Sequence, residues 1–93
     1  MTEDPLTLAL APSPDAQDTA VGYETVILHL GNDGYYGLDP IGTVVWNHLK
    51  RGDQPPTILK ALTARYDAPR LRIEADLRAL LQDMLANDIV VRA

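Results

Sequence analysis

The feature that most constrains this chain is an abrupt change of hydrophobic period at Asp39-Pro40. In "GYYGLDPIGTVVWNHL" (34–49), the residues before this dipeptide suit a short strand, and those after it repeat at helical spacing. Aspartate is a favoured N-cap, and proline is favoured at the first helical position, where no backbone N–H is needed. The sequence therefore predicts a strand joined to a helix with no linker between them.

Upstream of this junction the pattern is that of extended chain. "LTLALA" (6–11) alternates as a half-buried strand does, and "YETVILHL" (23–30) is the strongest strand, rich in β-branched residues. "PSPDAQDTA" (12–20) reads as a loop, and "GNDG" (31–34) as a four-residue hairpin loop leading back into "YYGL" (35–38). These segments predict a three-stranded antiparallel meander.

Downstream, three helices are expected. The first carries an apolar stripe ended by Gly52, the second opens at Pro55-Pro56, and the third runs from Arg70 to Asn87. A short extended segment is expected at Ile89–Arg92. We predict an α+β, winged-helix-like fold in which a three-stranded antiparallel sheet is followed by three helices, as one domain over residues 1–93.

The composition excludes several classes of protein. The chain has no cysteine, which rules out disulfides and cysteine-based metal sites and suits the cytoplasm. Its start, "MTEDPLTLAL", has no basic region or long apolar run, so neither a signal peptide nor a membrane span is expected. The formal net charge of −5 disfavours general nucleic-acid binding, which requires clustered Lys and Arg.

Few residues suggest catalysis. Ser13 stands between two prolines with no evident base, and His29 and His48 fit surface or structural roles. We therefore predict no enzyme activity, no cofactor and no metal site. Asp76, beside the apolar stripe of the third helix, allows two interpretations: an ion pair with Arg72 or Arg78, or a polar contact to a bound peptide.

Two features indicate a peptide-binding groove. A three-stranded meander has open edges, and the third strand carries no lysine or proline that would block pairing with another chain. The third helix also has a wider apolar stripe than one docking face requires. An extended peptide could then add as a fourth strand and place side chains against the helix. Packing of that stripe into the core, and edge pairing between two copies of the chain, remain alternatives.

The order and spacing of these segments resemble those of PqqD-like proteins, also called RiPP recognition elements. The resemblance covers about 23–91, through "GYYGLD", "PIGTVVWNHL", "RGDQPPTILKALTARYDAP" and "ADLRALLQDMLANDIV". The positions that fit the family pattern are Tyr36, Leu38, Asp39, Gly42, Trp46, Leu49, Gly52, Ile58, Leu62, Tyr66, Asp76, Leu77, Leu80, Leu81, Leu85 and Ile89. One departure is Asn87-Asp88, where the family usually has a glycine.

The resemblance implies a non-catalytic protein that binds the leader segment of a ribosomally made precursor peptide. The implied binding residues are Tyr35, Tyr36, Gly37 and Leu38 on the strand, and Asp76, Leu77, Leu80, Leu81 and Met84 on the third helix. As a free-standing chain it looks most like the recognition subunit of lasso-peptide systems, which works with a separate leader peptidase and cyclase. The alternatives are a partner of a radical-SAM enzyme and, from another class, a winged-helix DNA-binding or regulatory protein.

Overall fold

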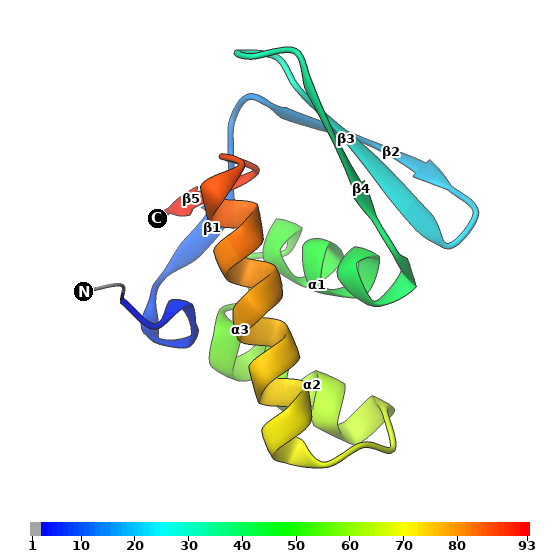
Figure 1. Cartoon of the computed structure of the whole chain (residues 1–93), viewed down its shortest axis with the longest axis vertical. Helices are drawn as coiled ribbons and strands as arrows, with labels where there is room; N and C mark the ends of the chain where they lie inside the picture. The colour runs from blue at the N-terminus through cyan, green and yellow to red at the C-terminus, as the bar shows by residue number, and fades with distance from the viewer. Residues whose placement is uncertain (1–2) are drawn as a thin grey trace.

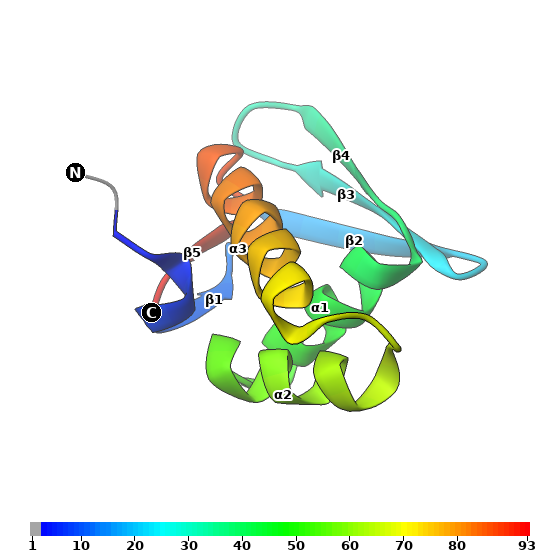
Figure 2. The same cartoon turned by 60° about the horizontal axis from the view of Figure 1, so that its bottom comes forward.

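The computed structural model describes residues 3–93 and confirms the predicted fold class (Figure 1). One antiparallel sheet has the strand order β2-β3-β4, formed by β2 (Ala16–Val21), β3 (Glu24–His29) and β4 (Gly34–Leu38). Three helices follow, namely α1 (Pro40–Lys50), α2 (Pro55–Arg65) and α3 (Arg70–Ala86). In Figure 2, α1 lies between the sheet and α2, while α3 runs across the open side of this stack.

The prediction of the first strand of the meander is wrong. Leu6 and Thr7 belong to a 3-10 turn, η1 (Pro5–Thr7), and the strand β1 (Leu10–Pro12) pairs with β5 (Val90–Arg92) instead of joining the sheet. The turn forms because the Asp4 carboxylate caps the Leu6 N–H at 3.0 Å and Pro5 fixes the backbone behind it. The extended segment expected at the C-terminal end is confirmed as β5.

The predicted loop over 12–20 is also wrong, because most of its second half is β2. This strand pairs along its whole length with β3, from Ala16 opposite His29 to Val21 opposite Glu24. Its side chains are small or polar, so no hydrophobic alternation marks it. The Asp18 carboxylate holds it to α1 by accepting hydrogen bonds from the Trp46 indole at 3.0 Å and from Lys50 at 2.7 Å.

The strand-to-helix junction has the predicted geometry. The Asp39 carboxylate accepts a hydrogen bond from the Gly42 N–H at 2.7 Å, and Pro40 is the first residue of α1. At the other end of the helix, Gly52 has φ +89° and donates its N–H to the Leu49 carbonyl, while Asp53 donates to His48. The sequence signals at both ends of α1 are therefore confirmed.

The hairpin between β3 and β4 turns one residue earlier than predicted. Gly34 already belongs to β4, and the turn occupies 30–33, with Asp33 in the left-handed region at φ 56°. Aspartate tolerates this conformation better than most residues do, so the turn needs no glycine at that position.

The core lies where the inner face of the sheet meets all three helices. Trp46, which is 1% exposed, is packed among buried side chains from β1, β3, α2, α3 and β5, including Leu10, Ile27, Leu81 and Val90. In the sheet, Thr25, Ile27 and His29 point inward, so the core face of β3 is the one that contains Ile27. The junction at Asp39 turns the chain from this sheet directly onto the helix beneath it.

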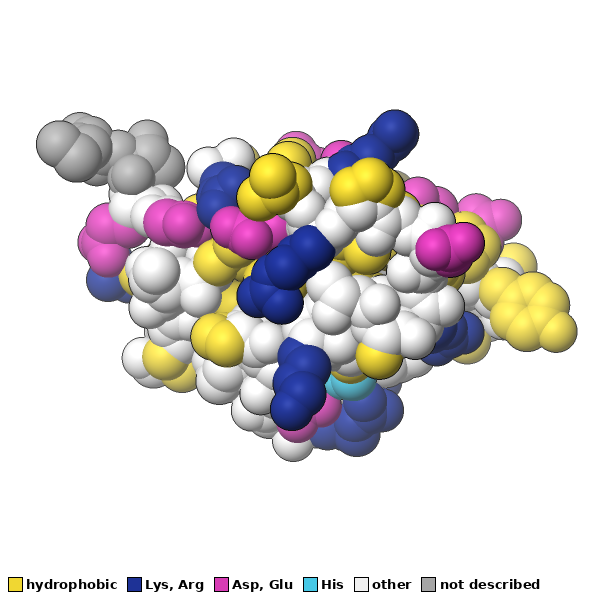
Figure 3. Space-filling view, turned by 90° about the horizontal axis from the view of Figure 1, so that it is seen from below, with side chains coloured by type: hydrophobic (Ala, Val, Ile, Leu, Met, Phe, Trp, Pro, Cys, Tyr) yellow, Lys and Arg dark blue, Asp and Glu magenta, His cyan; other side chains and the backbone are white. Residues whose placement is uncertain are grey.

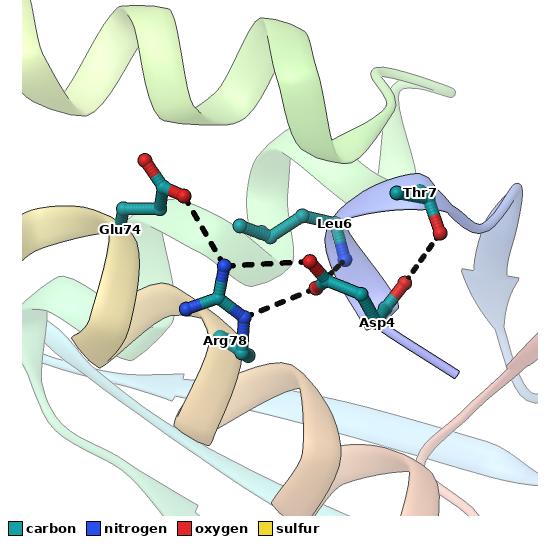
Figure 4. A network of polar contacts seen from close by, with 5 residues as sticks. All are labelled: Asp4, Leu6, Thr7, Glu74 and Arg78. Atoms are coloured by element: carbon teal, nitrogen blue, oxygen red, sulfur yellow. Dashed lines mark hydrogen bonds and ion pairs between the residues drawn. The ribbon is translucent and has the colours of Figure 1, made fainter. Parts of the chain in front are cut away.

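The N-terminal segment fixes α3 from the side opposite to the sheet (Figure 4). The Arg78 guanidinium contacts Asp4 through Nε at 3.1 Å and Nη2 at 3.3 Å, and Glu74 through Nη2 at 3.1 Å. The hydrogen bond from Arg78 lowers the pKa of the Asp4 carboxyl below its ordinary value. Residues two positions apart on a helix point in nearly opposite directions, so Arg78 lies away from Asp76 and Leu80.

Candidate functional site

The candidate site begins at the free edge of β4. Gly22 and Tyr23 form a two-residue hairpin loop, with Gly22 at φ +63°, so Val21 and Glu24 close it as a hydrogen-bonded pair. Hydrogen-bonded and non-hydrogen-bonded pairs alternate along antiparallel ladders, and β3 uses alternate residues toward its two neighbours. The backbone N–H and C=O groups of Tyr35 and Gly37 are thereby directed away from β3, toward the open edge.

The opposite wall of the site is α3. The Tyr36 hydroxyl donates a hydrogen bond to the Asp83 carboxylate at 2.5 Å, which links β4 to α3. Burial raises the pKa of the Tyr36 hydroxyl, and the hydrogen bond and charge of Asp83 raise it further, with a smaller contribution from the charge of Asp39. The phenol is therefore held as a neutral donor, and the bond joins the two walls.

An apolar cavity of about 310 Å³ lies where α1, α2 and α3 meet, near the end of β4 that leads into α1. Its apolar lining includes Ile41, Leu62, Tyr66, Ile73, Leu77 and Leu80. The charged side chains that line it are Asp67, Arg72 and Asp76. A concave apolar surface with a few polar groups is typical of a ligand-binding site.

A second hollow, of about 230 Å³, lies at the other end of β4, where the β3–β4 hairpin meets the end of α3. Its lining includes Tyr35, Tyr36, Asn87 and Asp88. The free edge of β4 therefore runs from this hollow, past the Tyr36–Asp83 bond, toward the apolar cavity. We call the whole surface the β4–α3 groove.

The nine residues predicted for peptide binding occupy different positions with respect to this groove. Tyr35 is 79% exposed, and Gly37 is also exposed, whereas Tyr36 and Leu80 are half-buried. Asp76 is exposed and lines the apolar cavity together with Leu77 and Leu80. The remaining side chains are buried, namely those of Leu38, Leu77, Leu81 and Met84. A direct contact to a peptide stays a prediction for all nine.

Sequence reasoning missed several residues of this surface, of which Ile41, Tyr66 and Asp83 are the most informative. Ile41 and Tyr66 line the apolar cavity, and Asp83 receives the Tyr36 hydrogen bond. Ile41 begins the apolar stripe of α1, which the sequence shows, but its exposed position on the cavity, at 47% exposure, is seen only in the structure. Asp83 lies seven residues, or about two helical turns, after Asp76, so both point from the same face of α3. This spacing is the sequence signal that could have identified Asp83.

The polar residues singled out in the sequence have structural partners. Arg72 Nε lies 3.8 Å from Asp76 Oδ2, with both side chains exposed, so the predicted pair with Arg72 forms and is weak. His48 Nδ1 lies 2.9 Å from Asp53 Oδ2 at the end of α1, and Ser13 is buried, with its hydroxyl accepting from the Asp15 N–H. Within residues 3–93, no group of three His, Cys, Asp or Glu side chains could hold a metal ion.

Figure 3 shows the face around α2, on which basic side chains lie among acidic and apolar ones. A surface that binds nucleic acid through phosphates needs Lys and Arg gathered together, and this face does not offer such a patch. Over the described part of the chain, no helix is both long enough and apolar enough to cross a membrane.

The fold and the β4–α3 groove define a small winged-helix-like α+β domain with an unpaired sheet edge facing a helix. The chain belongs to the PqqD family: the family model described as coenzyme PQQ synthesis protein D matches residues 24–90. No curated protein matches the sequence significantly.

Two solved structures are similar to the chain as a whole. TbiB1, solved in complex with the TbiA(beta) leader peptide, is 31% identical, with a TM-score of 0.83 over 86% of this chain and 93% of that one. A lasso peptide synthetase B1 complexed with the leader peptide is 22% identical, with a TM-score of 0.81 over 89% of this chain and 98% of that one. At that lower identity, the second match establishes the shared fold alone.

Proposed function

We propose that this protein binds the leader segment of a ribosomally synthesised precursor peptide and catalyses no reaction itself. The observation that carries the proposal is the open β4 edge facing α3, in a member of the PqqD family that is 31% identical to a protein solved with a leader peptide. A non-catalytic role is also supported by the three residues considered for catalysis. Ser13, His29 and His48 each make a hydrogen bond that holds the fold together.

The proposed mode of binding is strand addition to β4. The backbone groups of Tyr35 and Gly37 pair with the leader, and each hydrogen bond contributes about 0.5–1.5 kcal/mol net, whatever the leader sequence. Apolar leader side chains then provide selectivity, because burying one in the cavity contributes about 1.5–3 kcal/mol. The sum is compatible with micromolar to nanomolar affinity after the costs of association.

The predicted binding residues divide into two groups in this proposal. Tyr35, Tyr36, Gly37, Asp76 and Leu80 are exposed or half-buried and contact the leader. Leu77 forms the floor of the apolar cavity, while Leu38, Leu81 and Met84 hold β4 and α3 in place through the core. Both groups are needed, because a peptide strand fits only between walls held at a fixed separation.

The proposed partners follow from lasso-peptide systems, to which the chain is similar. A leader held along β4 would keep the adjoining core peptide accessible to a separate leader peptidase and a cyclase. We place this step in the cytoplasm, where precursor peptides are made, with no part for nucleic acid or membrane.

Fluorescence polarisation tests the proposal directly. The probe is a labelled leader peptide encoded by the precursor gene nearest to the gene of this protein. The resemblance to lasso-peptide systems implies a leader with a tyrosine and a proline as anchors. We expect saturable binding at micromolar concentration or tighter, lost when either anchor is replaced by alanine. Tight binding indifferent to those two changes would assign the protein to another peptide pathway. Failure to bind any neighbouring leader would overturn the proposal.

A further inference from the structure

The charge of this protein is concentrated along the β4–α3 groove. Asp67 and Asp76 line the apolar cavity, and Asp88 lines the hollow at the other end. Asp83 lies between them, bound to the Tyr36 hydroxyl, and Asp39 follows β4 as the N-cap of α1, with its charge also acting on that hydroxyl. Arg72 is the cation that lines this surface, so the groove has a formal charge of −4.

The rest of the molecule is almost neutral. The whole chain has 13 acidic and 8 basic residues, for a net charge of −5. Removing the five groove aspartates and Arg72 leaves eight acids and seven bases, a net charge of −1. One surface thus carries nearly all of the excess negative charge, whereas a charge excess that served only solubility would be distributed over the molecule.

Several carboxylates on other faces contact cations within the chain. Asp18 Oδ2 lies 2.7 Å from Lys50 Nζ, Asp4 contacts Arg78, and Glu3 forms a two-bond pair with Arg92 at 2.9 and 3.2 Å. Asp83 instead receives its contacts from neutral donors: the Tyr36 hydroxyl at 2.5 Å and the Asn87 amide at 3.5 Å.

The Tyr36 hydroxyl marks the centre of this negative field. Its pKa is raised partly by the charges of Asp83 and Asp39, so both carboxylates act on the same point between the groove walls. A cationic side chain lying here would interact favourably with two carboxylates at once. A carboxylate there would be repelled by both.

On the premise that the groove binds a leader strand, we propose that it selects leaders rich in lysine or arginine, with one cationic side chain lying beside Asp83 above Tyr36. Complementary charge would also steer the peptide to the groove, raising the association rate at low ionic strength. Backbone pairing and apolar anchors would hold the leader, while the carboxylates would exclude acidic segments.

The test selects short random peptides, displayed on their own mRNA, against the immobilised full chain. We expect the bound peptides to be enriched in Lys and Arg over the input library, with the enrichment strongest at one fixed distance from an apolar anchor. Recovery of binders without such enrichment would overturn the charge inference and leave strand addition standing. Recovery of no binder would count against the proposed function, and the inference that rests on it would fall too.

Variants of the protein then test whether the preference for a cationic side chain arises at Asp83. For a selected peptide and its copy with the fixed Lys or Arg changed to Gln, we expect the wild-type protein to prefer the cation about 3- to 10-fold at low salt. In Asp83→Asn, which keeps an acceptor for the Tyr36 hydroxyl, the preference should fall below about 2-fold. Glu24→Gln removes an equal charge at the far end of β3 and should change nothing. Equal preference in wild type and Asp83→Asn would refute the assignment to Asp83.

Discussion

His29 Nε2 lies 2.8 Å from Asp88 Oδ2 and joins the end of β3 to the second residue after α3. The His29 Nδ1 atom accepts hydrogen bonds from the Gly31 and Asn32 N–H groups, so the ring proton sits on Nε2 and is donated to Asp88. Asp88 has φ 55° and belongs to the Asn87-Asp88 pair, where the family resemblance implies a glycine. The α3 terminus is closed by the Ile89 N–H on the Met84 carbonyl. Asp88 therefore has a strained left-handed backbone, and its carboxylate binds a buried histidine.

Replacing Asp88 with alanine should lower the free energy of unfolding by about 1–3 kcal/mol. The reasons are the left-handed backbone, which alanine tolerates poorly, and the loss of the acceptor for His29. Urea denaturation measures this change. Asp33→Ala is a matched control, because Asp33 has φ 56° without a histidine partner, and it should cost about 1 kcal/mol. Equal losses in the two variants would mean that the His29 bond contributes nothing.

Asp18→Asn should reduce stability at neutral pH and have little effect in acid. The hydrogen bond from Lys50, followed by the one from Trp46, lowers the pKa of the Asp18 carboxyl in the folded protein. A lowered folded-state pKa contributes stability that is present above the unfolded value of about 3.9 and is lost as the pH falls through the folded value. Asparagine still accepts from Trp46, so the loss at pH 7 should be about 1 kcal/mol.

Thermal or urea unfolding across pH 2–7 tests this dependence. The difference between wild type and Asp18→Asn should be constant near neutrality and shrink below about pH 4. Glu24→Gln serves as control, since Glu24 lies on the neighbouring strand and is exposed. A difference that persists unchanged into acid would show that the Asp18 contribution is not ionic.

Gly37→Pro should abolish leader binding and leave the fold largely intact. Its N–H is directed to the free edge of β4, where proline removes a hydrogen-bond donor without breaking the pairing with β3. Ala20→Pro makes the same change on the opposite edge, since Ala20 in β2 also directs its backbone away from β3, and it should preserve binding. Circular dichroism checks both folds. Normal affinity in a folded Gly37→Pro protein would rule out strand addition at β4.

Leu80→Asp should weaken leader binding at least about 10-fold, because it places a charge on the apolar cavity and removes an apolar contact worth about 1.5–3 kcal/mol. Leu71→Asp is the matched control, since Leu71 lies on the same helix, is 79% exposed and does not line the cavity. Leu80 is half-buried, so circular dichroism must accompany the titration. A folded Leu80→Asp protein with unchanged affinity would remove α3 from the site.

The parts of the fold that could be predicted are those with a local chemical signature. Helix α1 begins at Asp39-Pro40 and ends before Gly52, as predicted, because capping and left-handed turns depend on the residues at the turn itself. The strand β2 gave no such signature, since it is held by backbone pairing with β3 and by the two hydrogen bonds that Asp18 accepts from α1. Hydrophobic periodicity cannot detect a strand whose side chains are mostly in solvent.

The division of α3 between core and groove could not be predicted for a related reason. Leu77, Leu80, Leu81 and Met84 belong to one broad apolar stripe, and η1, β5 and the sheet decide which part of it is covered. Of these elements, η1 and the strands of the sheet come from distant parts of the sequence. The stripe predicts that α3 packs on a large apolar surface, but the half-buried position of Leu80 follows only from the assembled neighbours.

The pairing of β1 with β5 has a consequence for the order in which the molecule folds. Leu10 lies opposite Arg92, and the Ala93 N–H binds the Ala9 carbonyl at 2.8 Å, whereas β2, β3, β4 and α1 follow one another directly along the chain. Contacts between close neighbours in sequence close small loops and form early, while a contact across nearly the whole chain waits for the rest. We expect the strands and helices that frame the groove to assemble first, and the two-stranded clasp to close last and open first.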